Sequence, residues 1–276
     1  MQLLDIQDYK KVKEQLSKVT FNYLFARSVV EGRVAGKIYV DDTSNPSTFY
    51  ILHPYGMSLL LGDCGNKDFN IAFKSYALNQ AHTRVAFEWM QVYPDDWSLL
   101  LEELFHGYLI PSANNTARQE KGIIELNTRV NFKFEEADYT SCWKKNIDKD
   151  ISIKQVDDQL FHKMQGSVVP SNFWNNADDF IKNGLAFALF YKEELASMAF
   201  SSFWFDDQFE MGIETKEKFR GMGFAEFVCS ALIDYCIEKR HEPIWACRLE
   251  NTASYKLAQK LGFQPICFLP YYRLSK

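Results

Sequence analysis

Residues 220–225, Arg-Gly-Met-Gly-Phe-Ala, have the composition of an anion-binding turn. Gly221 and Gly223 lack side chains, so a ligand can approach the backbone closely. A helical pattern begins directly afterwards, and the free N–H groups of a first helical turn point toward a bound negative charge. The turn therefore predicts a phosphate site, and a pyrophosphate suits it.

The elements that must position this turn follow from the pattern around it. Residues 209–215 are strand-like. After the turn, apolar residues recur at the spacing of an amphipathic helix, namely Phe227, Val228, Ala231, Leu232, Tyr235 and Cys236. A second strand-like run covers 243–249. Residues 251–263 then read Asn-Thr-Ala-Ser-Tyr-Lys-Leu-Ala-Gln-Lys-Leu-Gly-Phe.

Two of these segments resemble signatures of the GNAT family of N-acetyltransferases. Arg-x-x-Gly-x-Ala at 220–225 resembles the first, Gln/Arg-x-x-Gly-x-Gly/Ala. Residues 251–263 resemble the second, an Asn, a short helix and a closing Leu-Gly-Phe. The C-terminal end also resembles a two-lobed bacterial subfamily. The resemblance implies acetyl-CoA as co-substrate and a primary amine, expected to belong to a small molecule, that attacks the thioester directly.

The resemblance also implies which residues hold acetyl-CoA. The backbone of 213–215 is expected to pair with the pantetheine arm, with one N–H as oxyanion donor. The amides of 221–226 are expected to hold the pyrophosphate. Asn251 is expected to touch the arm, although Asn is also a favoured helix N-cap. The complete expected set is Ile213, Glu214, Thr215, Arg220, Gly221, Met222, Gly223, Phe224, Ala225, Glu226 and Asn251.

Glu210 and Glu214 are the candidate catalytic bases. They lie four residues apart on the strand that, by resemblance, meets the thioester, so both side chains point to one face. A carboxylate beside the acceptor amine can take its proton directly or through water. The alternative, that they are ordinary charges at a strand edge, has equal weight for each residue.

A tyrosine that protonates the coenzyme A thiolate in many family members is replaced here by Ala258. Tyr255, one helical turn earlier, is the candidate catalytic acid. A packing role is the stronger interpretation of Tyr255. Tyr271, Tyr272 and solvent are rival proton donors.

Composition limits the class of protein. The 276 residues are 47% hydrophobic and carry a net charge of −5, which indicates a folded protein and argues against binding to nucleic acid or to anionic membranes. No 18-residue apolar stretch and no signal peptide occur, and the six cysteines form no C-x-x-C pair. A cytoplasmic protein with reduced thiols and no metal site is expected.

The charged window 143–150 predicts a domain boundary, with an N-terminal α/β lobe at 1–145 and the GNAT domain at 146–276. In the second half, strands are expected at 151–156, 185–191, 195–205 and 209–215, with a hairpin at 192–194. Helices are expected at 157–165 and at 175–182, the second ending at Gly184 as a C′ residue. These patterns predict a mixed, mostly antiparallel sheet with helices on both faces, an α/β (α+β) fold whose topology the resemblance supplies.

The first half mixes strands and helices but lacks the glycine turn. It is expected to be a degenerate GNAT-like half that binds no cofactor. Its expected role is either to line the acceptor site or to form an interface between two copies in a homodimer.

Two other function classes share features with this sequence. A non-catalytic acyl-CoA sensor or structural module stays open because Ala258 cannot donate a proton. A dinucleotide-binding oxidoreductase is excluded, because Glu226 occupies the third glycine position of G-x-G-x-x-G.

Overall fold

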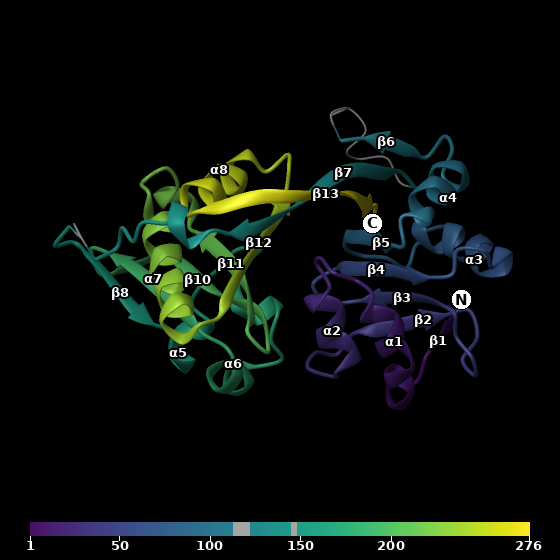
Figure 1. Cartoon of the computed structure of the whole chain (residues 1–276), viewed down its shortest axis with the longest axis horizontal. Coiled ribbons are helices and arrows are strands. Elements are labelled where there is room, and N and C mark those ends of the chain that lie inside the picture. Colours follow the sequence, from purple (N-terminus) through teal and green to yellow (C-terminus); the bar gives the residue numbers. More distant parts are fainter. Residues whose placement is uncertain (113–121, 145–147) are drawn as a thin grey trace. The chain divides into compact units, whose positions relative to one another are not determined.

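The computed structural model describes residues 1–112, 122–144 and 148–276, which form two compact units (Figure 1). The N-terminal unit comprises residues 1–130, 248–250 and 268–276. The C-terminal unit comprises residues 131–247 and 251–267. The predicted boundary between residues 145 and 146 lies outside the described residues.

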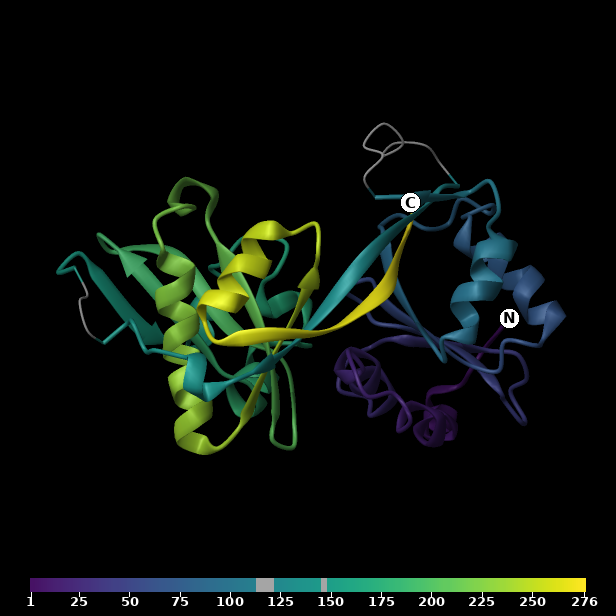
Figure 2. The same cartoon turned by 45° about the horizontal axis from the view of Figure 1, so that its top comes forward.

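The N-terminal unit is a mixed sheet with helices on both faces. Its elements are β1 (Gln2–Leu3), η1 (Ile6–Val12), α1 (Lys13–Leu16), α2 (Leu24–Val30), β2 (Lys37–Val40), β3 (Thr48–Leu52), β4 (Met57–Gly62), α3 (Lys67–Ala77), β5 (Glu88–Tyr93), α4 (Asp96–Leu104), β6 (Leu109–Pro111) and the start of β7 (Ile124–Phe134). The strand order is β1-β2-β3-β4-β5-β13-β7, with β6 on β7. In Figure 2, the purple α1 and α2 cover one face of this sheet, and the blue α3 and α4 cover the other.

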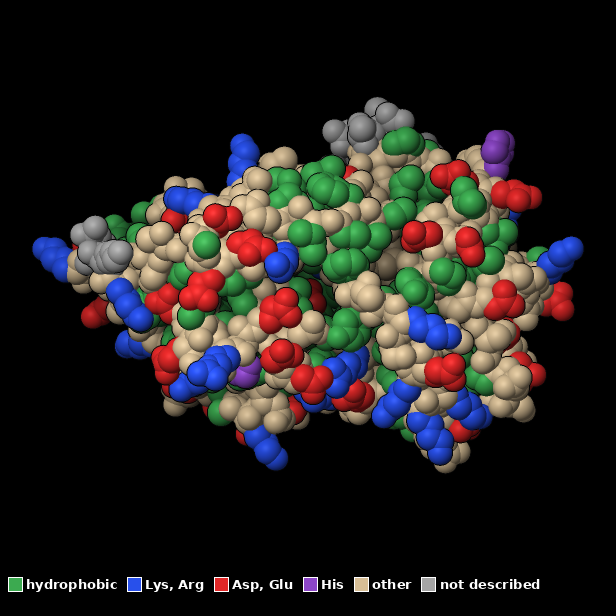
Figure 3. Space-filling model, viewed as in Figure 1, with side chains coloured by type: hydrophobic (Ala, Val, Ile, Leu, Met, Phe, Trp, Pro, Cys, Tyr) green, Lys and Arg blue, Asp and Glu red, His purple; other side chains and the backbone are tan. Residues whose placement is uncertain are grey.

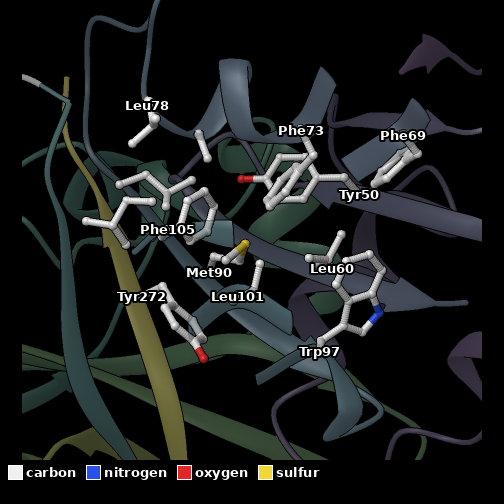
Figure 4. Packing of buried hydrophobic residues seen from close by; sticks show 13 residues of the cluster. Tyr50, Leu60, Phe69, Phe73, Leu78, Met90, Trp97, Leu101, Phe105 and Tyr272 are labelled. Atoms are coloured by element: carbon white, nitrogen blue, oxygen red, sulfur yellow. The ribbon is translucent and has the colours of Figure 1, made fainter. Parts of the chain in front are cut away.

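The core of the N-terminal unit lies under α3 and α4. Phe69, Phe73 and Ala77 recur every four residues along α3 and face Tyr50 of β3 and Trp97 of α4 (Figure 4). The side chain of Asn66 caps α3 by accepting a hydrogen bond from the Phe69 N–H at 3.0 Å. Large aromatic rings therefore fill the space between this sheet and its helices.

The C-terminal unit holds the second sheet. Its elements are the end of β7, η3 (Glu136–Asp138), β8 (Ile151–Gln155), α5 (Asp158–Phe161), η4 (Pro170–Asn172), α6 (Ala177–Asn183), β9 (Ala186–Tyr191), β10 (Glu194–Phe205), β11 (Gln208–Thr215), η5 (Glu217–Phe219), α7 (Phe224–Lys239), β12 (Glu242–Arg248), α8 (Thr252–Lys260) and β13 (Phe263–Leu274). The strand order is β8-β9-β10-β11-β12-β7, and α7 packs across β9, β10 and β11 (Figure 1). The predicted mixed, mostly antiparallel sheet is confirmed.

The chain before β8 is tied to α7 through one carboxylate. Asp234 of α7 accepts hydrogen bonds from Tyr139, Ser141 and Trp143 at 2.8, 2.8 and 2.9 Å, and it pairs with Lys144 at 3.2 Å. Burial opposes ionisation of Asp234, but the hydrogen bonds outweigh it and lower its pKa.

Two local expectations from the sequence are wrong. A helix is expected at 157–165, but α5 ends at Phe161, and residues 166–168 instead contact Glu214. Gly184 is expected to end α6 in a left-handed conformation, but its φ is −122°. The glycine is needed for space, because a Cβ there would come within 2.7 Å of the Phe180 ring.

The surface seen in Figure 3 mixes basic and acidic side chains rather than separating them into fields. Within the described ranges, no helix has the length and apolar character needed to cross a bilayer.

Candidate active site

The glycine turn adopts the conformation that its sequence predicts. Gly221 and Gly223 have φ values of +83° and +80°, which favour glycine, and Gly223 is the N-cap of α7. A Cβ built on either residue would meet nothing within 4 Å. The turn therefore faces open space, and these glycines are required by their backbone conformation rather than by crowding.

Free amides line this turn. The Met222 N–H donates to the Phe219 carbonyl at 3.4 Å, and the Glu226 N–H donates to the Gly223 carbonyl at 3.0 Å. Among the described residues, no acceptor takes a hydrogen bond from the N–H groups of Gly221, Gly223, Phe224 or Ala225. These four donors stand at the N-terminus of a 16-residue helix, where a phosphate is stabilised. The Met222 and Glu226 amides are expected to contribute less to anion binding, because both already donate to backbone carbonyls.

The two central strands of the C-terminal unit separate beside this turn. β11 pairs with β12 only at Gln208↔Glu242, Phe209↔Pro243 and Glu210↔Ile244. It pairs with β10 along its whole length, up to Thr215. The β12 side of β11 is therefore unpaired from Met211 onward, although both strands continue.

The free edge of β11 exposes the backbone of Ile213. The Lys216 N–H donates to the Ala196 carbonyl of β10, and the Ser197 hydroxyl donates to the Glu214 carbonyl. Backbone groups alternate in direction along a strand, so those of Ile213 and Thr215 point to the opposite, unpaired side. An extended ligand can add to this edge as a strand would.

Glu214 is held by its neighbours. Its carboxylate accepts hydrogen bonds from the N–H groups of Ser167 and Val168 at 3.0 and 3.1 Å, and it pairs with Arg220 at 3.3 Å. A Cβ on Gly166 would come within 2.4 Å of the carboxylate, so only glycine fits there. The Glu214 carboxylate therefore holds the loop of residues 166–168 in place.

Glu210 lies on the same face of β11 as Glu214 and is 6% exposed. Its residue pair with Ile244 is the last one before β11 and β12 separate. Glu210 therefore lies where the free edge of β11 begins.

Arg220 joins the turn to the end of β11. Its Nε donates to the Thr215 carbonyl at 3.1 Å, in addition to the pair with Glu214. Glu226, in the first turn of α7, pairs with Lys260 at 2.5 Å, and this hydrogen bond raises the pKa of Lys260. Lys260 therefore neutralises the one carboxylate in the first turn of α7, where an anion is expected.

The residues predicted on α8 have clear structural positions. Asn251 is the N-cap of α8 and accepts a hydrogen bond from the Ser254 N–H at 3.2 Å. Tyr255 is half-buried, with its ring edge-on to Phe132 at 5.3 Å. Ala258 is fully buried. The inward position that carries a tyrosine in many family members therefore holds a methyl group here.

The rival proton donors are packing residues of the N-terminal unit. Tyr272 is 1% exposed within the aromatic core, and burial raises its pKa (Figure 4). Tyr271 is 3% exposed and stacks on Trp89. Neither belongs to the unit that carries the glycine turn.

The corresponding region of the N-terminal unit differs in its strand edge and in the charge of its turn. β4 pairs with β5 at every residue from Met57↔Trp89 to Leu61↔Tyr93, so no free edge opens. The turn before α3 carries Asp63, whose carboxylate accepts from the Gly65 N–H at 2.9 Å. This turn therefore places a carboxylate where the turn before α7 has none.

Sequence reasoning missed Gly166 and the separation of β11 from β12. The Gly166 contact joins residues 48 positions apart, and the separation depends on pairing between strands, so neither has a local signal. In the described part of the chain, no three His, Cys, Asp or Glu side chains gather in a group able to hold a metal ion.

Comparison with known proteins gives the class. The model of the GNAT acetyltransferase family matches residues 15–272. The chain therefore belongs to this family, and it is an acetyltransferase with the predicted GNAT fold.

Individual relatives agree with this assignment. The chain is 25% identical over 267 residues to a Bacillus subtilis (strain 168) protein named uncharacterized N-acetyltransferase YdfB, with 95% of each chain covered. A GCN5-related N-acetyltransferase-like protein from Streptococcus suis has a similar fold, with a TM-score of 0.71, 20% identity, and 98% and 99% of the two chains covered. A tandem GNAT protein from the clavulanic acid biosynthesis pathway has a TM-score of 0.58 at 10% identity, over 99% and 97% of the chains.

Proposed function

We propose that this acetyltransferase uses acetyl-CoA to acetylate a primary amine of a small molecule by direct attack on the thioester. The observation that carries the proposal is the free edge of β11 after Glu210, next to four unbonded amides at the start of α7. The edge suits an extended pantetheine arm, and the amides suit a pyrophosphate.

The roles of the residues follow from their positions. The amides of Gly221, Gly223, Phe224 and Ala225 would bind the pyrophosphate, and the Ile213 N–H would donate to the thioester oxygen as charge develops on it. The side chain of Asn251 would reach the pantetheine arm in addition to capping α8. Holding both reactants in place accounts for much of the acceleration, up to about 7–11 kcal/mol.

Proton transfer needs a base and an acid. The amine nitrogen forms a bond to the carbonyl carbon, the carbon–sulfur bond breaks, the amine loses one proton and the thiolate gains one. Glu210 is the preferred base, because it lies at the point where β11 and β12 separate, whereas the carboxylate of Glu214 holds the backbone of residues 167–168. Tyr255 is the nearest candidate acid on α8, with water as its rival.

The N-terminal unit is proposed to be a diverged GNAT-like half without an acyl-CoA site. Like the C-terminal unit, it has three antiparallel strands, a helix and then a strand parallel to the third. Its fully paired β4 and β5 leave no free edge for a pantetheine arm, and the Asp63 carboxylate in the turn before α3 opposes binding of a pyrophosphate.

A second candidate function, acyl-CoA binding without turnover, is favoured by the buried methyl group of Ala258. Incubation of the full-length protein with acetyl-CoA and a panel of amines separates the two. The proposal predicts free thiol and acetylated amine in equal amounts. Coenzyme A binding in calorimetry without thiol release from any amine would favour the second candidate.

A further inference from the structure

Strand β10 contains one extra residue next to the proposed base. Ser201 pairs with Met211 and Phe203 pairs with Glu210, so Ser202 has no partner residue on β11. An extra residue in one strand of an antiparallel pair is a β-bulge, which bends the strand and increases its twist. Bulges are frequent beside active sites, where they change the direction of a side chain.

The bulge changes which side chain lies opposite Glu210. Phe200 and Phe203 are three residues apart, a spacing that places side chains on opposite faces of a regular strand. Both rings nevertheless contact the ring of Phe173, with centroids 5.6 Å apart in each case. Glu210 therefore has the aromatic Phe203 as its cross-strand neighbour, whereas a regular ladder would give it Ser202.

The Ser202 side chain also holds the main chain of Glu210. Its hydroxyl donates to the Glu210 carbonyl at 3.0 Å, and Ser202 and Glu210 are 5% and 6% exposed. On the other side of β11, Glu210 pairs with Ile244, and this is the last residue pair before β11 and β12 separate. Contacts from β10 therefore hold the strand where its free edge begins.

The neighbouring serine makes different contacts. The Ser201 hydroxyl accepts from the Leu185 N–H at 2.9 Å, and the Ser201 carbonyl accepts from the Trp174 indole at 2.8 Å. These bonds tie β10 to residues outside β11. Two adjacent buried serines thus have separate roles, and the contact with Glu210 belongs to Ser202.

We infer that Ser202 is a positioning residue for Glu210: its bulge sets the cross-strand neighbour of Glu210, and its hydroxyl fixes the Glu210 peptide at the start of the free edge. The inference rests on the proposed acetyl transfer, in which Glu210 is the base. Ser202 acts through Glu210 and is not itself a catalytic residue.

Kinetics of three variants test the role. Deletion of Ser202 removes the bulge while the other residue pairs of β10 and β11 stay in register. It should lower kcat by about 10²-fold, because a displacement of about 1 Å can cost that much, and leave coenzyme A affinity unchanged. Ser202→Ala keeps the bulge and loses the hydroxyl, so kcat should fall less, by up to about tenfold. It also carries the test if the deletion variant does not fold.

Ser201→Ala is the matched control, because it removes the hydroxyl of the adjacent buried serine. It should lower Tm, since the buried Leu185 N–H loses its acceptor, but the folded protein should keep the kcat of the wild type. Wild-type kcat in both Ser202 variants, or an equal loss of kcat in Ser201→Ala, would overturn the inference.

A carboxylate titration gives a readout that does not need turnover. The ¹³C signals of labelled glutamate carboxylates are followed by NMR against pH, and Glu210→Gln assigns the Glu210 signal. The Ser202 variants should change the titration curve of Glu210, and Ser201→Ala should not. An unchanged Glu210 curve would overturn the inference. A changed curve in a protein that releases no thiol with any amine would leave the positioning role standing and reject the proposed function.

Discussion

Replacing Gly223 with valine tests the proposed pyrophosphate site. Gly223 has φ = +80°, so a residue with a side chain costs about 1–2 kcal/mol there. For a chain of this size, that cost lowers Tm by about 2–8 °C. The same side chain would occupy the open space before the free amides of Gly221, Gly223, Phe224 and Ala225.

The effect on binding is expected to be larger than the effect on stability. A hydrogen bond to a charged group contributes about 1.5–3 kcal/mol, so the loss of two amide contacts costs about 3–6 kcal/mol. That cost corresponds to a weakening of roughly 10²–10⁴-fold. Calorimetric titration with coenzyme A measures it.

Gly107→Val is the matched control. Gly107 has φ = +81°, and a Cβ there also meets nothing within 4 Å, but it lies between α4 and β6 of the N-terminal unit. Both variants should lose similar stability, and only Gly223→Val should lose coenzyme A. Unchanged coenzyme A affinity in Gly223→Val, or an equal loss in both variants, would refute the reasoning.

Three further predictions concern single side chains. Glu210→Gln should lower kcat by about 10²–10⁴-fold with little change in coenzyme A affinity, and turnover equal to that of the wild type would rule out Glu210 as the base. Glu214→Gln should instead lower the free energy of unfolding by about 1–3 kcal/mol. Tyr255→Phe should slow turnover about tenfold or more and shift the high-pH limb of the rate profile if its hydroxyl is the acid, and full activity would leave water as the donor. Asp234→Asn should destabilise the protein by about 1.5–3 kcal/mol at pH 7 in denaturant titrations. Because the folded pKa of Asp234 is lowered, this difference should start to shrink at about pH 4 and should disappear only below the folded pKa, and a difference that does not shrink between about pH 5 and about pH 2 would contradict the assignment.

Local patterns predicted the elements around the site well. The glycine spacing located the turn before α7, and alternation located β9, β10 and β11. The β9–β10 hairpin at 192–193 was also predicted, although Lys192 and Glu193 take positive φ values of 49° and 65° without glycine. Helix α2 was missed, because its seven residues are nearly all buried and therefore lack an amphipathic period.

The contacts that give the site its chemistry could not be predicted from local sequence patterns. Whether Glu214 acts as a base or holds a loop depends on residues 166–168, far away in sequence. The free edge of β11 depends on where β12 diverges, which no residue type encodes. The membership of residues 248–250 and 268–276 in the N-terminal unit likewise comes from tertiary pairing.

Because the C-terminal part of the chain contributes to both units, experiments should use the full-length protein and not a fragment. A fragment of residues 148–276 lacks β7, the strand beside β12, so the full chain is needed.

The structure of the full-length protein crystallised with coenzyme A tests the central claim most directly. The pyrophosphate is expected on the amides of Gly221, Gly223, Phe224 and Ala225, with the pantetheine arm along the free edge of β11 at Ile213–Thr215. Coenzyme A bound in the N-terminal unit, or bound elsewhere in the C-terminal unit with this edge and turn empty, would contradict it.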